Sequence, residues 1–156
     1  MKELKITPPE GYEIDKEAST FEHIVFKPIQ KQLPKSWEEL GEINGWFVNN
    51  GSGIEDVRQV GIYLSHRNVF ATKEQAEASL ALAQLTQLRE VYRQGWIPDW
   101  KKGSLKYIIK KYEGEIVGDL YFIGSYFLAF QSEEVRDLFL TNFKDLIEKA
   151  SPLLFG

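Results

Sequence analysis

The feature that most constrains the fold is an apolar face that recurs every three or four residues near the end of the 156-residue chain. Ser132 precedes this face and is followed by two acids, Glu133 and Glu134, which is the order typical of a helix N-terminus. We expect a helix from Glu133 to about Ala150, ended by Pro152, with one side buried against another element. Its apolar positions are Val135, Leu138, Phe139, Phe143, Leu146, Ile147 and Ala150.

A second helix is expected from Lys73 to about Gln94. Thr72 and Gln75 have the spacing of a capping box, and Gly95 follows the last turn, where glycine is favoured. Its apolar stripe consists of Ala76, Leu80, Ala83, Leu88, Val91 and Tyr92, widened by Leu82 and Leu85. The several small alanines would allow another element to approach this helix closely.

Between the two helices the pattern predicts a meander of three strands. These strands are Leu105–Tyr112, Ile116–Ile123 and Tyr126–Gln131, with turns at residues 113–115 and 124–125. Trp96 to Trp100 contains Pro98, so this stretch cannot continue the preceding helix and is expected to form a rigid loop.

The first part of the chain shows weaker signals. We expect an N-terminal β-hairpin, from short apolar runs at Leu4 and Ile6 and at Phe21–Lys27, followed by a polar linker to residue 35. Ser36 and Glu39 form a further capping box, which predicts a short helix over Trp37–Ile43. Further strand-like stretches are Trp46–Val48, Val60–Leu64 and Asn68–Ala71.

Together these elements predict a single α+β domain over residues 1–156. Residues 1–35 would form an N-terminal hairpin arm and linker, and residues 36–156 the main body. The body would be a small antiparallel β-sheet with two long amphipathic helices packed on it. The chain is 43% hydrophobic and 27% charged, the composition of an ordinary globular protein and not of a disordered one.

The residue content argues against catalysis. The chain has no cysteine, which excludes a disulfide scaffold, a thiol nucleophile and a thiolate metal site. Its only histidines, His23 and His66, are more than 40 residues apart and belong to no metal-ligand or nucleophile motif. His23 falls in an apolar strand, where a structural role is expected, and His66 falls in an exposed turn. We therefore expect no catalytic residue, no metal site and no cofactor.

No targeting or membrane-spanning segment is expected. The first residues lack the apolar region of a signal peptide, and the longest apolar candidate, within Leu120–Phe130, is too short to span a bilayer. We expect a cytoplasmic protein without a membrane partner.

Positive charge is concentrated in one segment of a chain whose formal net charge is −4. The cations of residues 89–111 are Arg89, Arg93, Lys101, Lys102, Lys106, Lys110 and Lys111. Two tryptophans, Trp96 and Trp100, lie among them in the sequence. One hypothesis is a nucleic-acid interface, in which the cations neutralise phosphates and a tryptophan stacks on a base. The other is structural: the lysines form the solvent face of a strand, and the tryptophans anchor the loop to the sheet. We favour the structural hypothesis, because charge runs are usually solvated surface.

Several segments resemble a large set of uncharacterised phage and mobile-element proteins of gut anaerobic bacteria. In that set an Ala/Leu/Gln helix, here within Ala71–Trp100, leads into a Trp-x-Pro-Asp-Trp loop and a Lys-Tyr strand, here Lys106-Tyr107. The similarity continues through Leu128–Ile147, and also covers Pro9–Asp15 and Ser19–Lys27. Gln131 departs from it, since similar sequences tend to carry Lys there.

The resemblance implies a prophage or mobile-element origin and supplies no catalytic residues to transfer. Our leading hypothesis is therefore a non-catalytic accessory or structural protein that binds a macromolecule, either protein or nucleic acid. A nucleic-acid-binding module that uses residues 89–111 is the alternative, and an enzyme is the least favoured class.

Overall fold

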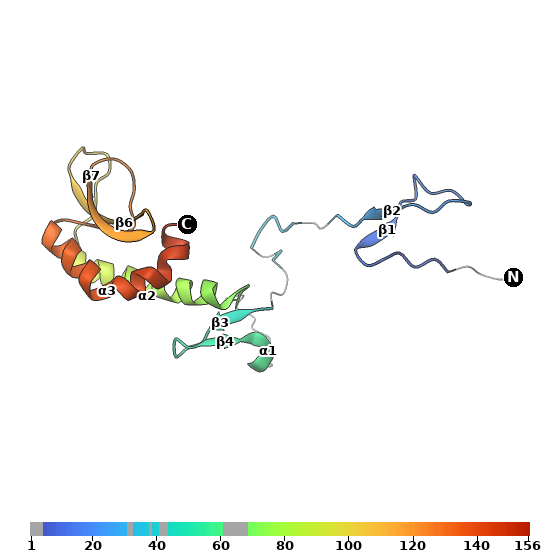
Figure 1. Ribbon diagram of the computed structural model, residues 1–156, viewed down its shortest axis with the longest axis horizontal. Coiled ribbons are helices and arrows are strands. Elements are labelled where there is room, and N and C mark those ends of the chain that lie inside the picture. The colour runs from blue at the N-terminus through green and yellow to red at the C-terminus, as the bar shows by residue number, and fades with distance from the viewer. Residues whose placement is uncertain (1–4, 31–32, 38, 41–43, 61–68) are drawn as a thin grey trace. The chain divides into compact units, whose positions relative to one another are not determined.

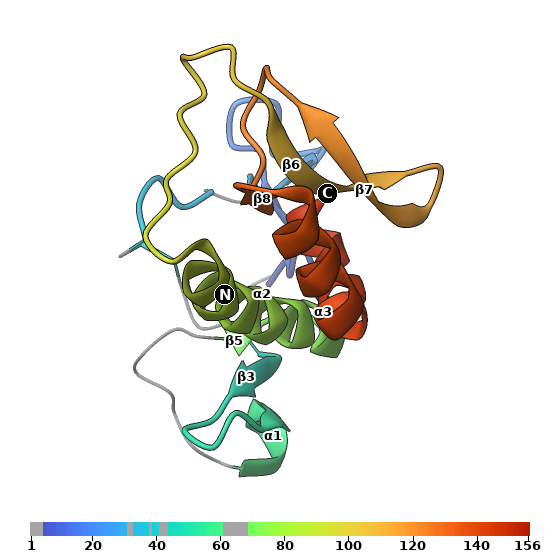
Figure 2. The same ribbon diagram turned by 90° about the vertical axis from the view of Figure 1, so that its left-hand side faces the viewer.

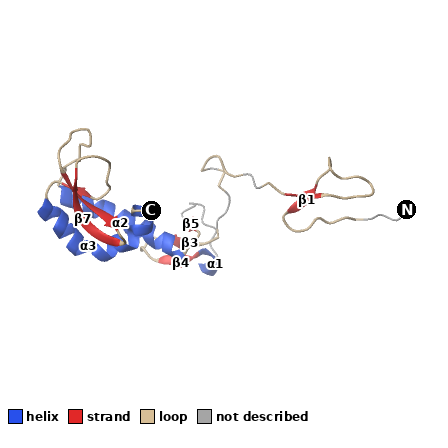
Figure 3. Ribbon diagram, turned by 45° about the horizontal axis from the view of Figure 1, so that its top comes forward, coloured by secondary structure: helices blue, strands red, loops and turns tan. Residues whose placement is uncertain are grey.

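The computed structural model describes residues 5–30, 33–37, 39–40, 44–60 and 69–156. The chain divides into two compact units, Met1–Gly41 and Glu42–Gly156. The described residues form three small antiparallel sheets, two long helices and one short helix, so the α+β class is confirmed (Figure 1, Figure 3).

The first unit contains a two-stranded sheet that is shorter than expected. Strand β1, Tyr12–Ile14, pairs antiparallel with β2, Phe26–Pro28. Most of the expected strand Phe21–Lys27 is irregular, and Phe21 is fully exposed. Turns take its place, because the Asp15 carboxylate accepts backbone N–H groups just after β1 and Thr20 bonds the backbone of His23. His23 is exposed, so the expectation of a structural histidine in an apolar strand was wrong.

The short helix expected over Trp37–Ile43 is not present in the described residues. Ser36 Oγ does accept the Glu39 N–H at 3.4 Å, as a capping box requires. The Glu39 carboxylate, however, accepts from the N–H of Lys35 and not from that of Ser36. One turn follows, closed by a Leu40 N–H to Trp37 C=O bond, and residues 38 and 41–43 lie outside the described part.

A three-stranded sheet of order β4-β3-β5 opens the second unit. Its strands are β3 (Trp46–Val48), β4 (Ile54–Asp56) and β5 (Val69–Phe70). Strands β3 and β5 confirm the expected strands at these positions. Val60, expected in a strand, is instead the last residue of the short helix α1 (Val57–Val60). Residues 61–68, which include the rest of that expected strand and His66, lie outside the described part.

Helix α2, Lys73–Arg93, begins and ends almost as predicted. Thr72 Oγ1 accepts the Gln75 N–H at 3.2 Å, and Gln94 and Gly95 both adopt positive φ angles after the last turn. The buried side is rotated from the predicted stripe, because Ala83 is exposed and Val91 is 70% exposed. Ala76, Ala78, Ala81 and Leu85 are the buried apolar residues of α2.

Helix α3, Glu133–Leu154, is capped by Ser132 Oγ as expected and continues further than predicted. Pro152 lies inside its last turn and does not end it, since proline removes only one helical N–H there and Phe155 N–H still reaches Ser151 C=O. The helix kinks at Phe143, whose φ of −126° and ψ of 20° are not helical. Leu138, assigned to the apolar face, is 54% exposed.

The C-terminal sheet has the order β7-β6-β8 and not the predicted meander order. Its strands are β6 (Lys106–Tyr112), β7 (Glu115–Tyr121) and β8 (Ala129–Phe130). Glu113 and Gly114, both at positive φ, join β6 to β7 in a two-residue turn that favours a tight hairpin. Strand β6 is central because it pairs with both β7 and β8, and Ile108 and Ile109, on its opposite faces, are both buried.

The core of the second unit lies between the long helices and this sheet (Figure 2). Phe139 of α3 is its centre, with ring centroids 5.1 Å from Tyr92 and 4.9 Å from Phe130. Helix α3 contacts all three strands of the C-terminal sheet, whereas α2 contacts the sheet β4-β3-β5 as well as α3. The prediction of two helices on one sheet is therefore correct only in part.

Candidate functional site

Two cations of the segment 89–111, Arg89 and Arg93, bind main-chain carbonyls at the β8 side of the C-terminal sheet. Arg93 is 7% exposed, and its guanidinium donates from Nε to Ala129 C=O at 2.8 Å and from Nη2 to Phe127 C=O at 3.1 Å. Arg89 donates to the same Phe127 carbonyl at 3.2 Å and lies over the Phe127 ring. Burial lowers the pKa of Arg93 to about 10, with repulsion by Arg89 a smaller cause, and Glu90 pairs with both arginines. These two arginines therefore satisfy carbonyls at β8 and are not free for phosphates.

Lys106 is also internal, with 1% of its surface exposed. Its ammonium donates to the carbonyls of Lys102 and Ser104 at 2.9 and 2.8 Å and to the Ser104 hydroxyl at 3.1 Å. The same ammonium lies 5.2 Å from the centre of the Trp100 ring. Lys106 thus closes the loop that precedes β6, and Trp100 covers it.

The tryptophans of the loop are half-buried. Trp100 packs toward Tyr126 with ring centroids 6.1 Å apart, and the Trp96 ring lies 5.8 Å from the Arg93 guanidinium. Both contacts fit the anchoring role that the structural hypothesis gives them.

Lys110 lies on the sheet face that carries Lys106 and is paired there. It forms an ion pair with Asp119 of β7 and lies within 5.5 Å of the ring centres of Tyr112 and Tyr121. The hydrogen bond between them is the main cause that raises the pKa of Lys110 and lowers that of Asp119. Burial, the largest cause, raises the pKa of the neighbouring Tyr126.

The remaining cations of the segment, Lys101, Lys102 and Lys111, are exposed. Lys101 and Lys102 follow Asp99, whose carboxylate accepts both of their backbone N–H groups. Lys111 lies on the opposite face of β6 from Lys110 and reaches Ser151 of α3 at 3.4 Å. The structure therefore does not gather the seven predicted cations on one surface.

A second buried arginine was missed by sequence reasoning, because it belongs to no charge cluster. Arg136 of α3 is 6% exposed, donates to Asp119 C=O of β7 at 3.1 Å and pairs with Glu133 and Asp137. It lies against Gly118, where a Cβ atom would come within 2.6 Å of Arg136 Nε. Arg136 thus binds β7 from α3, just as Arg93 binds the segment around β8 from α2.

An exposed apolar surface lies at the end of the C-terminal sheet where β6 begins and β7 ends. We call this surface the apolar end; its residues are Leu105, Leu120, Tyr121, Phe122 and Ile123, which are 55%, 41%, 37%, 51% and 65% exposed. The pairings Lys106↔Tyr121 and Tyr107↔Leu120 place Leu105 beside Phe122. Their side chains alternate between the two faces of the sheet, and the Tyr121 ring lies 5.2 Å from that of Tyr126. Exposed apolar residues gathered at one end of a sheet are candidates for an interaction site. The run Leu120–Ile123 was the available sequence signal, and it was expected only as the second half of the strand Ile116–Ile123.

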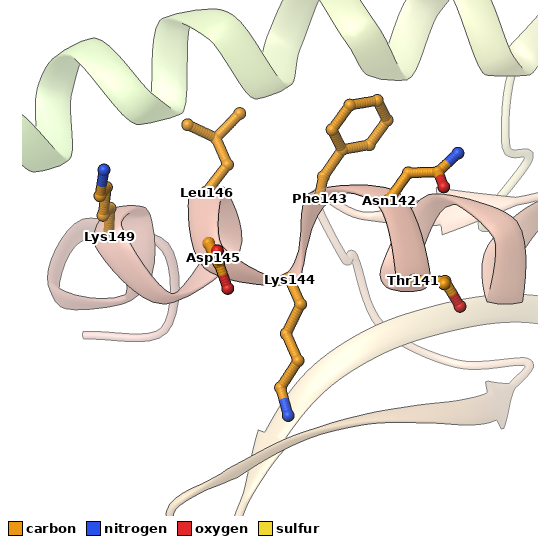
Figure 4. A pocket seen from close by; sticks show the side chains of 7 residues that line it. All are labelled: Thr141, Asn142, Phe143, Lys144, Asp145, Leu146 and Lys149. Atoms are coloured by element: carbon orange, nitrogen blue, oxygen red, sulfur yellow. The ribbon is translucent and has the colours of Figure 1, made fainter.

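The kink of α3 forms a shallow hollow of about 280 Å³ (Figure 4). Phe143 and Leu146 point from it toward α2, whereas Lys144 points to the other side of the helix. Its lining combines apolar and charged side chains but contains no histidine or paired carboxylates. In the described part of the chain there is no group of three or more side chains able to hold a metal, and no helix suited to crossing a bilayer.

Replacing Arg93 by Met should lower the free energy of unfolding by about 2–3 kcal/mol, because the buried carbonyls of Phe127 and Ala129 lose a charged donor. The matched change Arg89→Met should cost less than about 1 kcal/mol, since Arg93 still bonds the shared carbonyl. Urea denaturation followed by tryptophan fluorescence measures both. Equal losses in the two variants would contradict the assignment of Arg93 as the main contact.

No family model, curated protein or solved structure matches this chain.

Proposed function

We propose that the chain is a non-catalytic binding protein that holds a protein partner at the apolar end of its C-terminal sheet. The observation that carries this proposal is the exposure of Leu105 and of the run Leu120–Ile123 on neighbouring strand ends. Burying such a surface in a complex would remove apolar area from water, which is the main driving force of protein association.

The internal cations support the same proposal. Lys106 closes the loop before β6, and Arg136 donates to the Asp119 carbonyl of β7, so both fix the strands that present the apolar end. Arg93 holds β8 on the other side of β6. A surface held in one conformation loses less conformational entropy when a partner binds.

The biological setting that we propose, a phage or mobile element, rests on the resemblance of several segments to proteins of such elements. The Trp96–Trp100 loop and the Leu128–Ile147 segment support a phage or mobile-element origin. A cytoplasmic accessory or structural role would fit a small binding protein of such an element.

The double change Phe122→Ser and Ile123→Ser should abolish partner capture, because it removes the two most exposed side chains of the run Leu120–Ile123. Ile97→Ser is the matched control, since Ile97 is 82% exposed but lies outside the apolar end. The tagged full chain would be used to recover partners from its native cells, with quantification by mass spectrometry. Proteins that are captured equally by the double variant and by the wild type would contradict the proposal.

Nucleic-acid binding is the second candidate, favoured by the exposed pair Lys101 and Lys102 beside Trp100. Charge reversal at Lys106 or Lys110 would break internal contacts of the protein. The test variant is therefore the double change Lys101→Glu and Lys102→Glu, and Lys111→Glu is its control. We expect no tight binding of labelled DNA or RNA at two salt concentrations. Tight, salt-sensitive binding that is lost only in the Lys101/Lys102 variant would establish this second function instead.

A further inference from the structure

Strand β7 has a free edge. It pairs with β6 on one side, and within the residues that the structure describes no strand pairs with its other side. It has seven residues, as many as β6, and its last two residues, Leu120 and Tyr121, belong to the apolar end. Long unprotected edges of this kind are templates for a further strand.

The register shows which backbone groups of β7 point outward. The two-residue turn makes Tyr112 and Glu115 a hydrogen-bonded pair, so Val117 and Asp119 also bond β6, and Ile116 and Gly118 point away from it. The same alternation turns Ile109 toward β8, where its N–H donates to Leu128 C=O at 2.9 Å.

The usual protections of an edge strand are few on β7. It contains no proline and no lysine. One outward group is occupied, since the Asp119 carboxylate accepts the Leu120 N–H at 2.7 Å. Gly118 is exposed and has no side chain that would keep another backbone away. The outward N–H and C=O groups of Ile116 and Gly118 therefore offer the pairing positions.

The charge along this edge selects the kind of strand that fits. Glu113 and Glu115 lie in the turn and at the start of β7 and are exposed. At the other end, Arg136 is shared by two acids, Glu133 and Asp137, both more than half exposed. These groups are four acids, Glu113, Glu115, Glu133 and Asp137, against the one cation Arg136. An incoming segment with lysine or arginine would complement this edge.

We propose that the partner adds an extended, basic segment to the free edge of β7, by main-chain hydrogen bonds to Ile116 and Gly118, while its apolar side chains cover the apolar end. This inference rests on the proposed function, since it states how the partner of that same surface binds. A second copy of the chain fits poorly, because edge-to-edge pairing would bring the two acidic edges together.

The probe is a blocked seven-residue peptide in which valine alternates with lysine and threonine, matched in length to β7. It is titrated into the ¹⁵N-labelled full chain, and the amide signals of β7 are followed. We expect the Ile116 and Gly118 amides to shift and to gain protection from exchange. A peptide with glutamate in place of lysine should bind about tenfold more weakly or worse.

Ile116→Pro removes one outward N–H without removing a bond to β6, and Ile116→Val is its matched control. We expect peptide binding to weaken about tenfold in the proline variant and to be unchanged in the valine variant. Should the proline variant not fold, an N-methylated copy of the lysine peptide replaces it, because methylation removes the donors from the ligand instead.

Equal binding of the lysine and glutamate peptides, or none at about 1 mM, would overturn the inference. A dimer in sedimentation that disappears with Ile116→Pro would also overturn it, since the edge would then be occupied by a second copy. If partner capture still depends on Phe122 and Ile123 while no peptide binds, the proposed function holds and only this mode of binding fails.

Discussion

Two buried guanidinium groups hold the C-terminal sheet to the long helices. Arg93 of α2 binds the carbonyls of Phe127 and Ala129 at one side of the sheet, and Arg136 of α3 binds the carbonyl of Asp119 on the strand at the other side. Because these acceptors are main-chain atoms, each arginine fixes the position of a strand and not only of a side chain. Gly118 has to be small because the Arg136 guanidinium lies directly against it.

The internal contacts of these cations reduce the number of positive groups that a partner could reach. Arg93 and Lys106 are buried, and Arg89 and Lys110 are paired with neighbouring acids, so the basic segment provides few free cations. The exposed residues near it include the apolar end and the outward groups of β7. The edge of β7 that remains free lies among acids, which favours a basic protein segment over a polyanion.

Helix positions could be predicted from the sequence because their signals are local. Thr72 and Ser132 cap α2 and α3 as their spacing indicates, and the Glu113-Gly114 turn lies at its expected place. The strand order could not be predicted, since β8 is only two residues long and its place beside β6 depends on tertiary contacts. The extension of α3 past Pro152 likewise depends on packing of the last turn.

The site was harder to predict than the fold. Arg93 and Lys101 look alike in a sequence, and only the three-dimensional arrangement separates a cation bonded to buried carbonyls from one in solvent. Leu120 and Phe122 likewise belong to the expected strand Ile116–Ile123, and the sequence does not show whether that strand is exposed. They are exposed because they lie at the end of the outer strand β7 and just beyond it.

Hydrogen exchange of single amides along β7 in the full chain shows whether the outer edge of this strand is free, because it reports which side of the strand is bonded. We expect an alternation: slow exchange for Val117 and Asp119, which bond β6, and fast exchange for Ile116 and Gly118, which point outward. Equally slow exchange of all four amides would show that the edge is already covered, and would contradict the claim that this edge is left for a partner.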